Sequence, residues 1–119
     1  MIIEAEFDTV HAVFRRAAEK WPDQGAICST SYPGRDYYPD GVEFTYGQAW
    51  ERIEALRGQY ADAGYGHGHR VALFLEQRPE FFFHYLALNG LGCGIVPINP
   101  DYRHDEMLYQ MQHSEADLA

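Results

Sequence analysis

Apolar residues recur along this chain at helical spacings in some stretches and form short strand-length runs in others. Val10, Phe14 and Ala17 lie three or four positions apart, which predicts a first helix that ends near Lys20. Asp8 stands where its side chain would cap this helix. The first predicted element is therefore an amphipathic helix.

Two short runs with strand character follow the first helix, at Ala26–Ser31 and Val42–Thr45. The residues between them, Tyr32–Gly41, are rich in Pro, Gly, Asp and Tyr, a composition typical of turns and loops. We therefore expect a short hairpin that carries a long tyrosine-rich loop.

A second helix is predicted from Thr45 to Gly64. Thr45 and Gln48 have the spacing of a capping box, in which each side chain bonds the backbone amide of the other residue. Apolar residues then recur on one face as far as Tyr60. The helix should end at Gly64, because a glycine just past a helix readily takes the left-handed conformation.

The second half of the chain alternates strands and helices. Val71–Leu75 and Ile95–Ile98 are apolar runs of strand length, and Pro79–Leu91 between them begins with a proline suited to a first helical turn. A further helix is predicted from a cap at Asp101 to about Ser114, and 116–119 has the pattern of a strand beginning. This order predicts an α/β fold, a partial doubly wound parallel sheet with flanking helices and right-handed crossovers.

Composition and charge narrow the classes of function. A chain of 119 residues is long enough for one small domain, and its 15% aromatic content indicates an ordered protein. Asp and Glu outnumber Lys and Arg by 18 to 9, so the formal net charge is −9 and the average field repels polyphosphates. We therefore expect no nucleic-acid partner.

The spacing of the cysteines and the lengths of the apolar segments indicate where in the cell the protein is located. Cys28 and Cys93 have no CxxC spacing, which is typical of reduced thiols in the cytosol. The acidic start Met1–Glu6 has too short an apolar part for a signal peptide. Gly90–Ile98 is far shorter than the roughly 20 residues of a transmembrane helix. We predict a cytoplasmic protein with no transmembrane segment.

Two glycine-rich segments invite a phosphate-binding interpretation. Gly64–Arg70 has a basic end, but it follows a predicted helix and enters a strand. Phosphate-binding loops have the opposite order, since they follow a strand and open a helix whose amides point at the anion. Gly90–Gly94 has the same unsuitable orientation. Both segments are therefore predicted to be tight connectors.

The histidines offer a possible metal site. His67 and His69 could join His104 or His113 as zinc ligands, but no ligand spacing supports this, and solvated loop histidines are the favoured interpretation. His84 lies in the aromatic helix and is expected to be buried and hydrogen-bonded rather than a catalytic base.

The remaining reactive side chains also favour structural roles. Cys93 lies in a turn of small residues and is predicted to be an inert buried thiol. Ser29–Ser31 lack the glycine pattern of a nucleophile elbow. Glu76 and Glu80 flank the carboxyl end of a predicted strand, where ligands bind in open sheets. The electrostatics of a helix start explains Glu80 equally well.

The strongest motif pattern is carried by four segments: Thr45-Tyr46, Gly68–Leu73, Arg78–Phe81 and Gly90–Arg103, the last followed by Glu106 and Tyr109. In order and spacing they resemble the opening of an AMP-binding, adenylate-forming enzyme, most similar to acyl-CoA synthetases. The resemblance runs from about Asp8 to Ala119. The chain departs from the pattern at His69, where the family often has Asp, and in its tyrosine-rich loop.

The resemblance implies that the matching positions are a framework of turns, caps and strands. They are Thr45, Tyr46, Gly64, Gly68, Arg70, Val71, Pro79, Glu80, Gly92, Pro97, Asn99, Pro100, Tyr102 and Glu106. The family's phosphate-contacting loop and catalytic lysine do not occur in the 119 residues, and the one lysine, Lys20, lies outside any matching motif. We therefore assign no catalytic, cofactor-binding or metal-binding residue.

For the complete enzyme, the resemblance implies ATP-dependent activation of a carboxylic acid with Mg²⁺, followed by transfer of the acyl group to CoA. We expect residues 1–119 to be the N-terminal portion of the large N-terminal domain, an incomplete domain that is inactive alone. Its aromatic helix, apolar on most sides, should cause self-association. The competing hypothesis is a stand-alone α/β module that binds a protein partner without catalysis.

Overall fold

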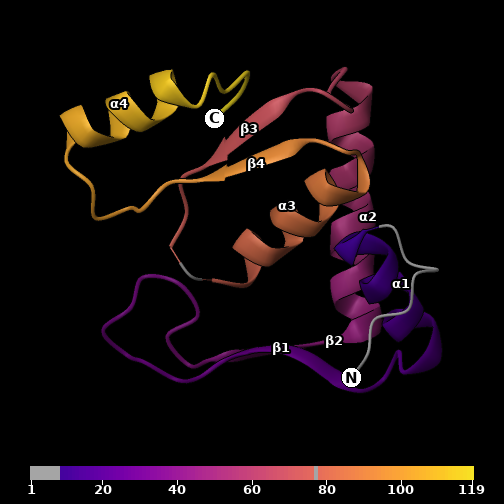
Figure 1. The fold of residues 1–119 in the computed structure, drawn as a ribbon. Helices are drawn as coiled ribbons and strands as arrows, with labels where there is room; N and C mark the ends of the chain where they lie inside the picture. Colours follow the sequence, from indigo (N-terminus) through magenta and orange to yellow (C-terminus); the bar gives the residue numbers. More distant parts are fainter. Residues whose placement is uncertain (1–8, 77) are drawn as a thin grey trace.

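The computed structural model describes residues 9–76 and 78–119. It contains four helices and four strands in these residues (Figure 1). In chain order they are α1 (Val10–Lys20), β1 (Gly25–Ser29), β2 (Val42–Thr45), α2 (Tyr46–Asp62), β3 (Arg70–Leu73), α3 (Pro79–Gly90), β4 (Gly94–Pro97) and α4 (His104–His113). Each lies where the apolar pattern predicts an element, with ends that differ by a few residues.

The strands form two small sheets. β1 and β2 pair antiparallel as the expected hairpin, and β3 and β4 pair parallel with Val71 opposite Ile95. α3 connects β3 to β4, which confirms the predicted βαβ unit. Ala72 donates its N–H to the carbonyl of Leu118 at 2.7 Å. The chain at Leu118 therefore runs parallel to β3 and forms a single β-bridge with it at Val71. The α/β prediction is confirmed.

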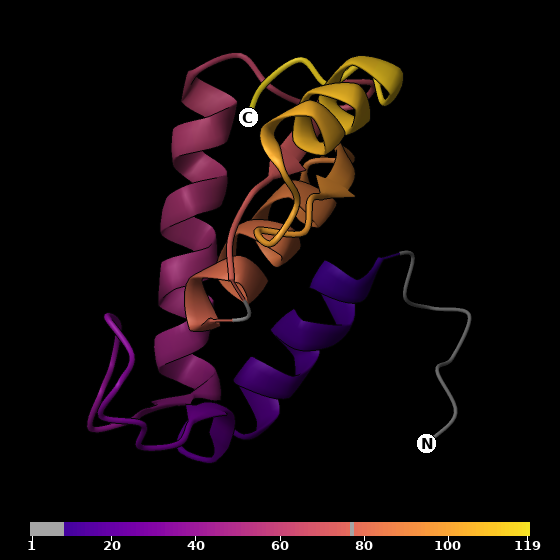
Figure 2. The same cartoon turned by 90° about the vertical axis from the view of Figure 1, so that its left-hand side faces the viewer.

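Helix α3 lies at the centre of the fold, between the β3–β4 sheet on one side and the hairpin with α1 and α2 on the other (Figures 1 and 2). Phe83 and Ala87 pack with Phe44 and Ile53 in one core cluster. Leu88 packs in a second cluster against the strand β3. A helix that is apolar on most sides is therefore covered on two faces, as its sequence predicts.

Of the two predicted helix caps, Asp101 is wrong and Asp8 lies outside the described residues. Thr9 caps α1, where its Oγ1 accepts the N–H of Ala12 at 3.0 Å. Asp101 does not cap α4, because the N-cap residue is Arg103, two positions later, and Asp101 lies in the preceding turn, where its N–H donates to Oδ1 of Asn99 at 2.9 Å. The helix therefore starts only after Arg103, whose side chain makes no capping hydrogen bond.

Helix α4 has no buried residue. Arg70 holds the chain just beyond it, with Nη1 donating to the carbonyl of Ser114 at 2.9 Å and lying 3.5 Å from Glu115. The arrangement leaves Leu108 and Tyr109 exposed.

Candidate functional site

The carboxyl ends of β3 and β4 open into a hollow of about 840 Å³, which we call the edge hollow. Ile98 follows β4 and donates its N–H to the carbonyl of Leu73 at 2.9 Å, which keeps the two strand ends together. The described residues that line the hollow are Leu75, Glu76, Phe81, Phe82, Pro97, Ile98, Asn99, Pro100, Asp101 and Tyr102. Open parallel sheets bind ligands at this edge, so the edge hollow is the candidate site.

Most of the residues that line the edge hollow have apolar or aromatic side chains, and two of them, Glu76 and Asp101, carry carboxylates. None of its described lining residues is Lys, Arg or His. Stabilising phosphates or a carboxylate in such a place requires cations or donors aimed at the charge. The edge hollow therefore offers apolar side chains, but its described lining has no cation that would hold the phosphates of ATP.

Four side chains meet where the tyrosine-rich loop touches the start of α3. The Tyr38 hydroxyl donates to a carboxylate oxygen of Glu80, and the Arg78 guanidinium lies 4.4 Å from the ring centre of Tyr37. Nε of Arg78 donates to Glu80 at 2.9 Å. The hydrogen bond to Glu80 raises the pKa of Tyr38. Burial raises the pKa of Glu80, but the bonds from Tyr38 and Arg78 outweigh it and lower that pKa overall.

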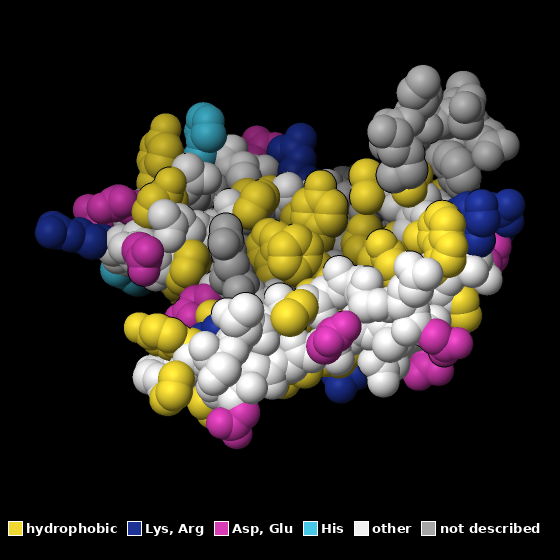
Figure 3. All heavy atoms as spheres, turned by 90° about the horizontal axis from the view of Figure 1, so that it is seen from below, with side chains coloured by type: hydrophobic (Ala, Val, Ile, Leu, Met, Phe, Trp, Pro, Cys, Tyr) yellow, Lys and Arg dark blue, Asp and Glu magenta, His cyan; other side chains and the backbone are white. Residues whose placement is uncertain are grey.

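A second hollow, of about 480 Å³, lies between α1, β1 and α3 and is almost wholly apolar. Its lining residues come from α1, β1 and α3: Val10, Phe14, Ala26, Ile27, Cys28, Phe82, Tyr85 and Leu86. Figure 3 shows hydrophobic side chains gathered in the middle of this side of the molecule. We call it the apolar hollow, and it offers contact surface but no group for catalysis.

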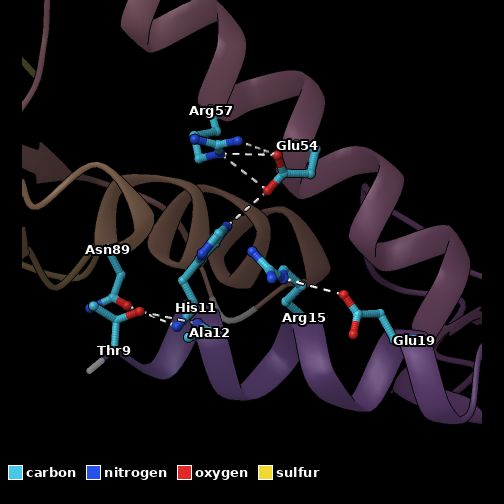
Figure 4. Close-up of polar contacts among 8 residues, drawn as sticks. All are labelled: Thr9, His11, Ala12, Arg15, Glu19, Glu54, Arg57 and Asn89. Carbon is cyan, nitrogen blue, oxygen red and sulfur yellow. Dashed lines mark hydrogen bonds and ion pairs between the residues drawn. The ribbon is translucent and has the colours of Figure 1, made fainter. Parts of the chain in front are cut away.

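A polar network joins the three long helices (Figure 4). His11 of α1 places Nε2 2.8 Å from Oε1 of Glu54, and its backbone N–H donates to Asn89 of α3 at 2.9 Å. Arg57 in turn donates to both oxygens of Glu54, at distances from 2.6 to 3.1 Å. The ring of His11 also packs on Trp50, with centroids 4.9 Å apart. This network positions α1 and has a structural role.

The network predicts a loss of stability in acid. Burial raises the pKa of Glu54, but the hydrogen bonds from Arg57 and His11 outweigh it and hold that pKa below its ordinary value. A carboxyl group with a lowered folded-state pKa stabilises the fold above its unfolded pKa of about 4.3, and this contribution is lost as pH falls through the folded value. Urea unfolding from pH 7 to 3 should show a shallower decline for Glu54→Gln than for the unsubstituted chain.

Glu19 supplies the control for that experiment. It pairs with Arg15 at 3.3 Å on the exposed face of α1, and both side chains are more than half exposed. Such surface pairs contribute little. Glu19→Gln should leave the pH dependence unchanged, and an equal flattening by both substitutions would contradict the assignment to Glu54.

The structure gives structural roles to His69 and His84. His69 accepts the N–H of Gly66 at 3.0 Å through Nδ1, inside the connector between α2 and β3. His84 is partly buried and pairs its Nδ1 with the Tyr60 hydroxyl at 2.8 Å. No group of three or more His, Cys, Asp and Glu residues within 9–76 and 78–119 is placed to hold a metal ion.

The cysteines are both free, Cys28 exposed and Cys93 buried. Sγ of Cys93 donates to the carbonyl of Gly66 at 3.3 Å, and burial raises the pKa of its thiol. A protonated buried thiol is a poor nucleophile, as expected from the sequence.

The contact of Tyr37 and Tyr38 with Arg78 and Glu80 is not predicted by the sequence analysis. The tyrosine-rich loop itself was the sequence signal for it.

The chain belongs to the AMP-binding enzyme family, whose sequence pattern matches residues 14–119. Crotonobetaine/carnitine–CoA ligase of Proteus mirabilis (strain HI4320) is 32% identical over 74 residues, which are 62% of this chain and 14% of the ligase. Tyrocidine synthase 3 of Brevibacillus parabrevis is 27% identical over 110 residues, which are 92% of this chain and 2% of the synthase. The chain thus spans a small part of each relative.

Solved structures show the same fold. The Klebsiella oxytoca NpsA N-terminal subdomain in complex with 3-hydroxybenzoyl-AMSN matches with a TM-score of 0.81 and 22% identity, over 98% of this chain and 28% of that one. The N-terminal domain of FACL13 from Mycobacterium tuberculosis matches with a TM-score of 0.79 and 23% identity, over 94% and 27%. None of the described helices is long and apolar enough to cross a membrane.

Proposed function

We propose that residues 1–119 are the N-terminal portion of an ATP-dependent acyl-activating enzyme. In this reaction a carboxylate oxygen attacks the α-phosphate of ATP with Mg²⁺ bound, and pyrophosphate leaves as the acyl-adenylate forms. The thiol of CoA then attacks the acyl carbon, and AMP leaves. The observation that carries the proposal is the family match across residues 14–119. The choice of CoA as acceptor rests on the similarity to a CoA ligase.

These residues would supply framework rather than catalytic groups. The edge hollow has no cation in its described lining, and Lys20 lies at the exposed end of α1 with its ammonium 4.9 Å from the ring of Trp21. The groups that contact ATP, Mg²⁺ and CoA would therefore come from residues outside 1–119. These residues would accordingly be an incomplete portion of the large N-terminal domain. The two free thiols fit a cytoplasmic location.

The proposal is tested first by the reading frame that encodes this chain. Continuation past Ala119 into a Ser/Thr/Gly-rich loop followed by Lys would support it, since that loop and lysine surround the phosphates in the family. The product of the whole frame should then form an acyl-CoA thioester, detected by mass spectrometry, from ATP, Mg²⁺, CoA and a panel of carboxylic acids. A frame that ends at Ala119 would favour the non-catalytic interaction module.

We predict that the 119-residue chain self-associates through the apolar hollow. Phe82 is 46% exposed and lines both hollows, so a partner that covers it removes apolar area from water. Sedimentation velocity across a dilution series should show oligomers that dissociate on dilution. Phe82→Ser should shift the population to monomer.

Phe74 provides the matched control for self-association, because it is also 46% exposed but lines neither hollow. Phe74→Ser should leave the oligomer population unchanged. A monomer at every concentration, or an equal effect of the two substitutions, would contradict association through the apolar hollow.

A further inference from the structure

The tyrosine-rich loop between β1 and β2 has a defined internal structure. Arg35 holds it together, since its guanidinium donates to the carbonyls of Thr30, Tyr37 and Tyr38 at 2.8, 2.7 and 2.6 Å. Gly41 closes the loop at a φ of +86°, where a Cβ would lie 2.8 Å from the carbonyl oxygen of Ser29. These contacts define the backbone path of the loop and so the places from which Tyr37 and Tyr38 project.

The loop reaches the start of α3 (Figure 1). Tyr38 donates to Glu80, and the Arg78 guanidinium lies 4.4 Å from the ring centre of Tyr37 and 5.9 Å from that of Tyr38. The side chains of Arg78 and Glu80 are 30% and 25% exposed, so this contact is partly shielded from water. A cation over an aromatic face and a hydroxyl bonded to a carboxylate are both stronger when partly desolvated.

The same contact is connected to the core. The Tyr38 ring meets Phe44 edge-on with centroids 6.5 Å apart, and Phe44 meets the buried Phe83 of α3 at 5.0 Å. Phe81 and Phe82, which lie between Glu80 and Phe83 in sequence, form one wall of the edge hollow. The position of that wall thus depends on how the first turn of α3 is held.

We propose that Tyr37 and Tyr38 are positioning residues that strap the loop to the first turn of α3 and thereby fix the wall of the edge hollow. The strap is an ordered state in equilibrium with an open one. A reactant that occupies the hollow binds the strapped state, and its apparent affinity falls in proportion to the strapped fraction. Only this last step rests on the proposed function.

The first test measures the strap in the 119-residue chain by amide hydrogen exchange. Tyr38→Phe removes the hydroxyl and keeps the ring, so the amides of Phe81 and Phe82 should exchange about fivefold faster, the loss expected for one hydrogen bond. Tyr32→Phe is the control, because Tyr32 is in the same loop and 62% exposed. Unchanged exchange in Tyr38→Phe, or an equal change in both variants, would overturn the strap.

Two further readouts separate a strap from general destabilisation. In a Glu80→Ala background, Tyr38→Phe should have no additional effect on exchange, whereas an additive effect would contradict the pairing. The guanidinium protons of Arg78 should resonate upfield because the guanidinium carbon lies over the Tyr37 ring, 4.4 Å from its centre. Tyr37→Leu should abolish this shift and Tyr37→Phe should keep it, while a shift that persists in Tyr37→Leu would contradict the stacking.

The functional arm uses the product of the whole reading frame. Tyr38→Phe should raise the KM of the carboxylic acid, by up to about fivefold, with kcat retained, because fewer molecules have the wall in place. No change in that KM would overturn the role in the hollow. An enzyme inactive with every acid would refute the proposed function, while the exchange experiment would still decide the strap.

Discussion

Replacing Phe83 by alanine is expected to destabilise the fold by about 3–5 kcal/mol, the cost of a large cavity in a packed core. Phe83 is 1% exposed and packs edge-on against Phe44 in the cluster that joins α2, α3 and the hairpin. Small domains have about 5–15 kcal/mol of total stability. The variant should therefore unfold at a much lower urea concentration or fail to fold.

Phe82 is the control for that substitution, because it is the adjacent residue of the same helix but lies 46% exposed. Phe82→Ala should cost about 1 kcal/mol, since only about half of this residue is buried and its removal leaves no enclosed cavity. Urea unfolding monitored by circular dichroism measures both variants. Equal destabilisation would show that the two faces of α3 are assigned wrongly.

Gly90→Ala is expected to destabilise the chain by about 1–3 kcal/mol, the usual cost of overpacking. A Cβ at this position would lie 2.7 Å from both Cγ and Cδ2 of His11. The ring cannot turn away freely, because Nε2 is bonded to Glu54 at 2.8 Å and the ring packs on Trp50. The substitution should therefore push α1 away from the end of α3.

Gly58→Ala is the opposite case. Gly58 is exposed in the interior of α2, and no atom lies within 4 Å of the place that a Cβ would take, so alanine replaces glycine without a clash. The gain in helix propensity should stabilise the chain by about 0.5–1 kcal/mol. Thermal unfolding should show opposite shifts for the two glycine substitutions, and a stabilising Gly90→Ala would contradict the contact with His11.

Most of the fold was predictable because its signals are local. The capping box of Thr45 and Gln48 forms in the structure, with Thr45 N–H to Oε1 of Gln48 at 2.9 Å and Gln48 N–H to Oγ1 of Thr45 at 3.1 Å. Pro79 begins α3, and Val71 lies opposite Ile95 in the parallel pair. These features depend on residues that are close in sequence or on continuous apolar runs.

The contacts that hold the elements together were not predictable in the same way. Tyr38 and Glu80 are 42 residues apart, and His11 and Asn89 are 78 apart. Neither pair has a spacing or period that a single sequence reveals, because tertiary packing brings them together. The predicted cap at Asp101 is wrong for a local reason, because the residues before the N-cap Arg103 form a turn in which Oδ1 of Asn99 accepts the N–H of Asp101.

Pyrophosphate exchange tests the central claim most directly. With ATP, Mg²⁺ and radiolabelled pyrophosphate, the product of the whole reading frame should incorporate label into ATP only when a suitable carboxylic acid is present. The 119-residue chain should show none, since the described lining of its edge hollow has no cation to hold phosphates. Exchange by the 119-residue chain alone, or none by the whole product with any acid, would contradict the account.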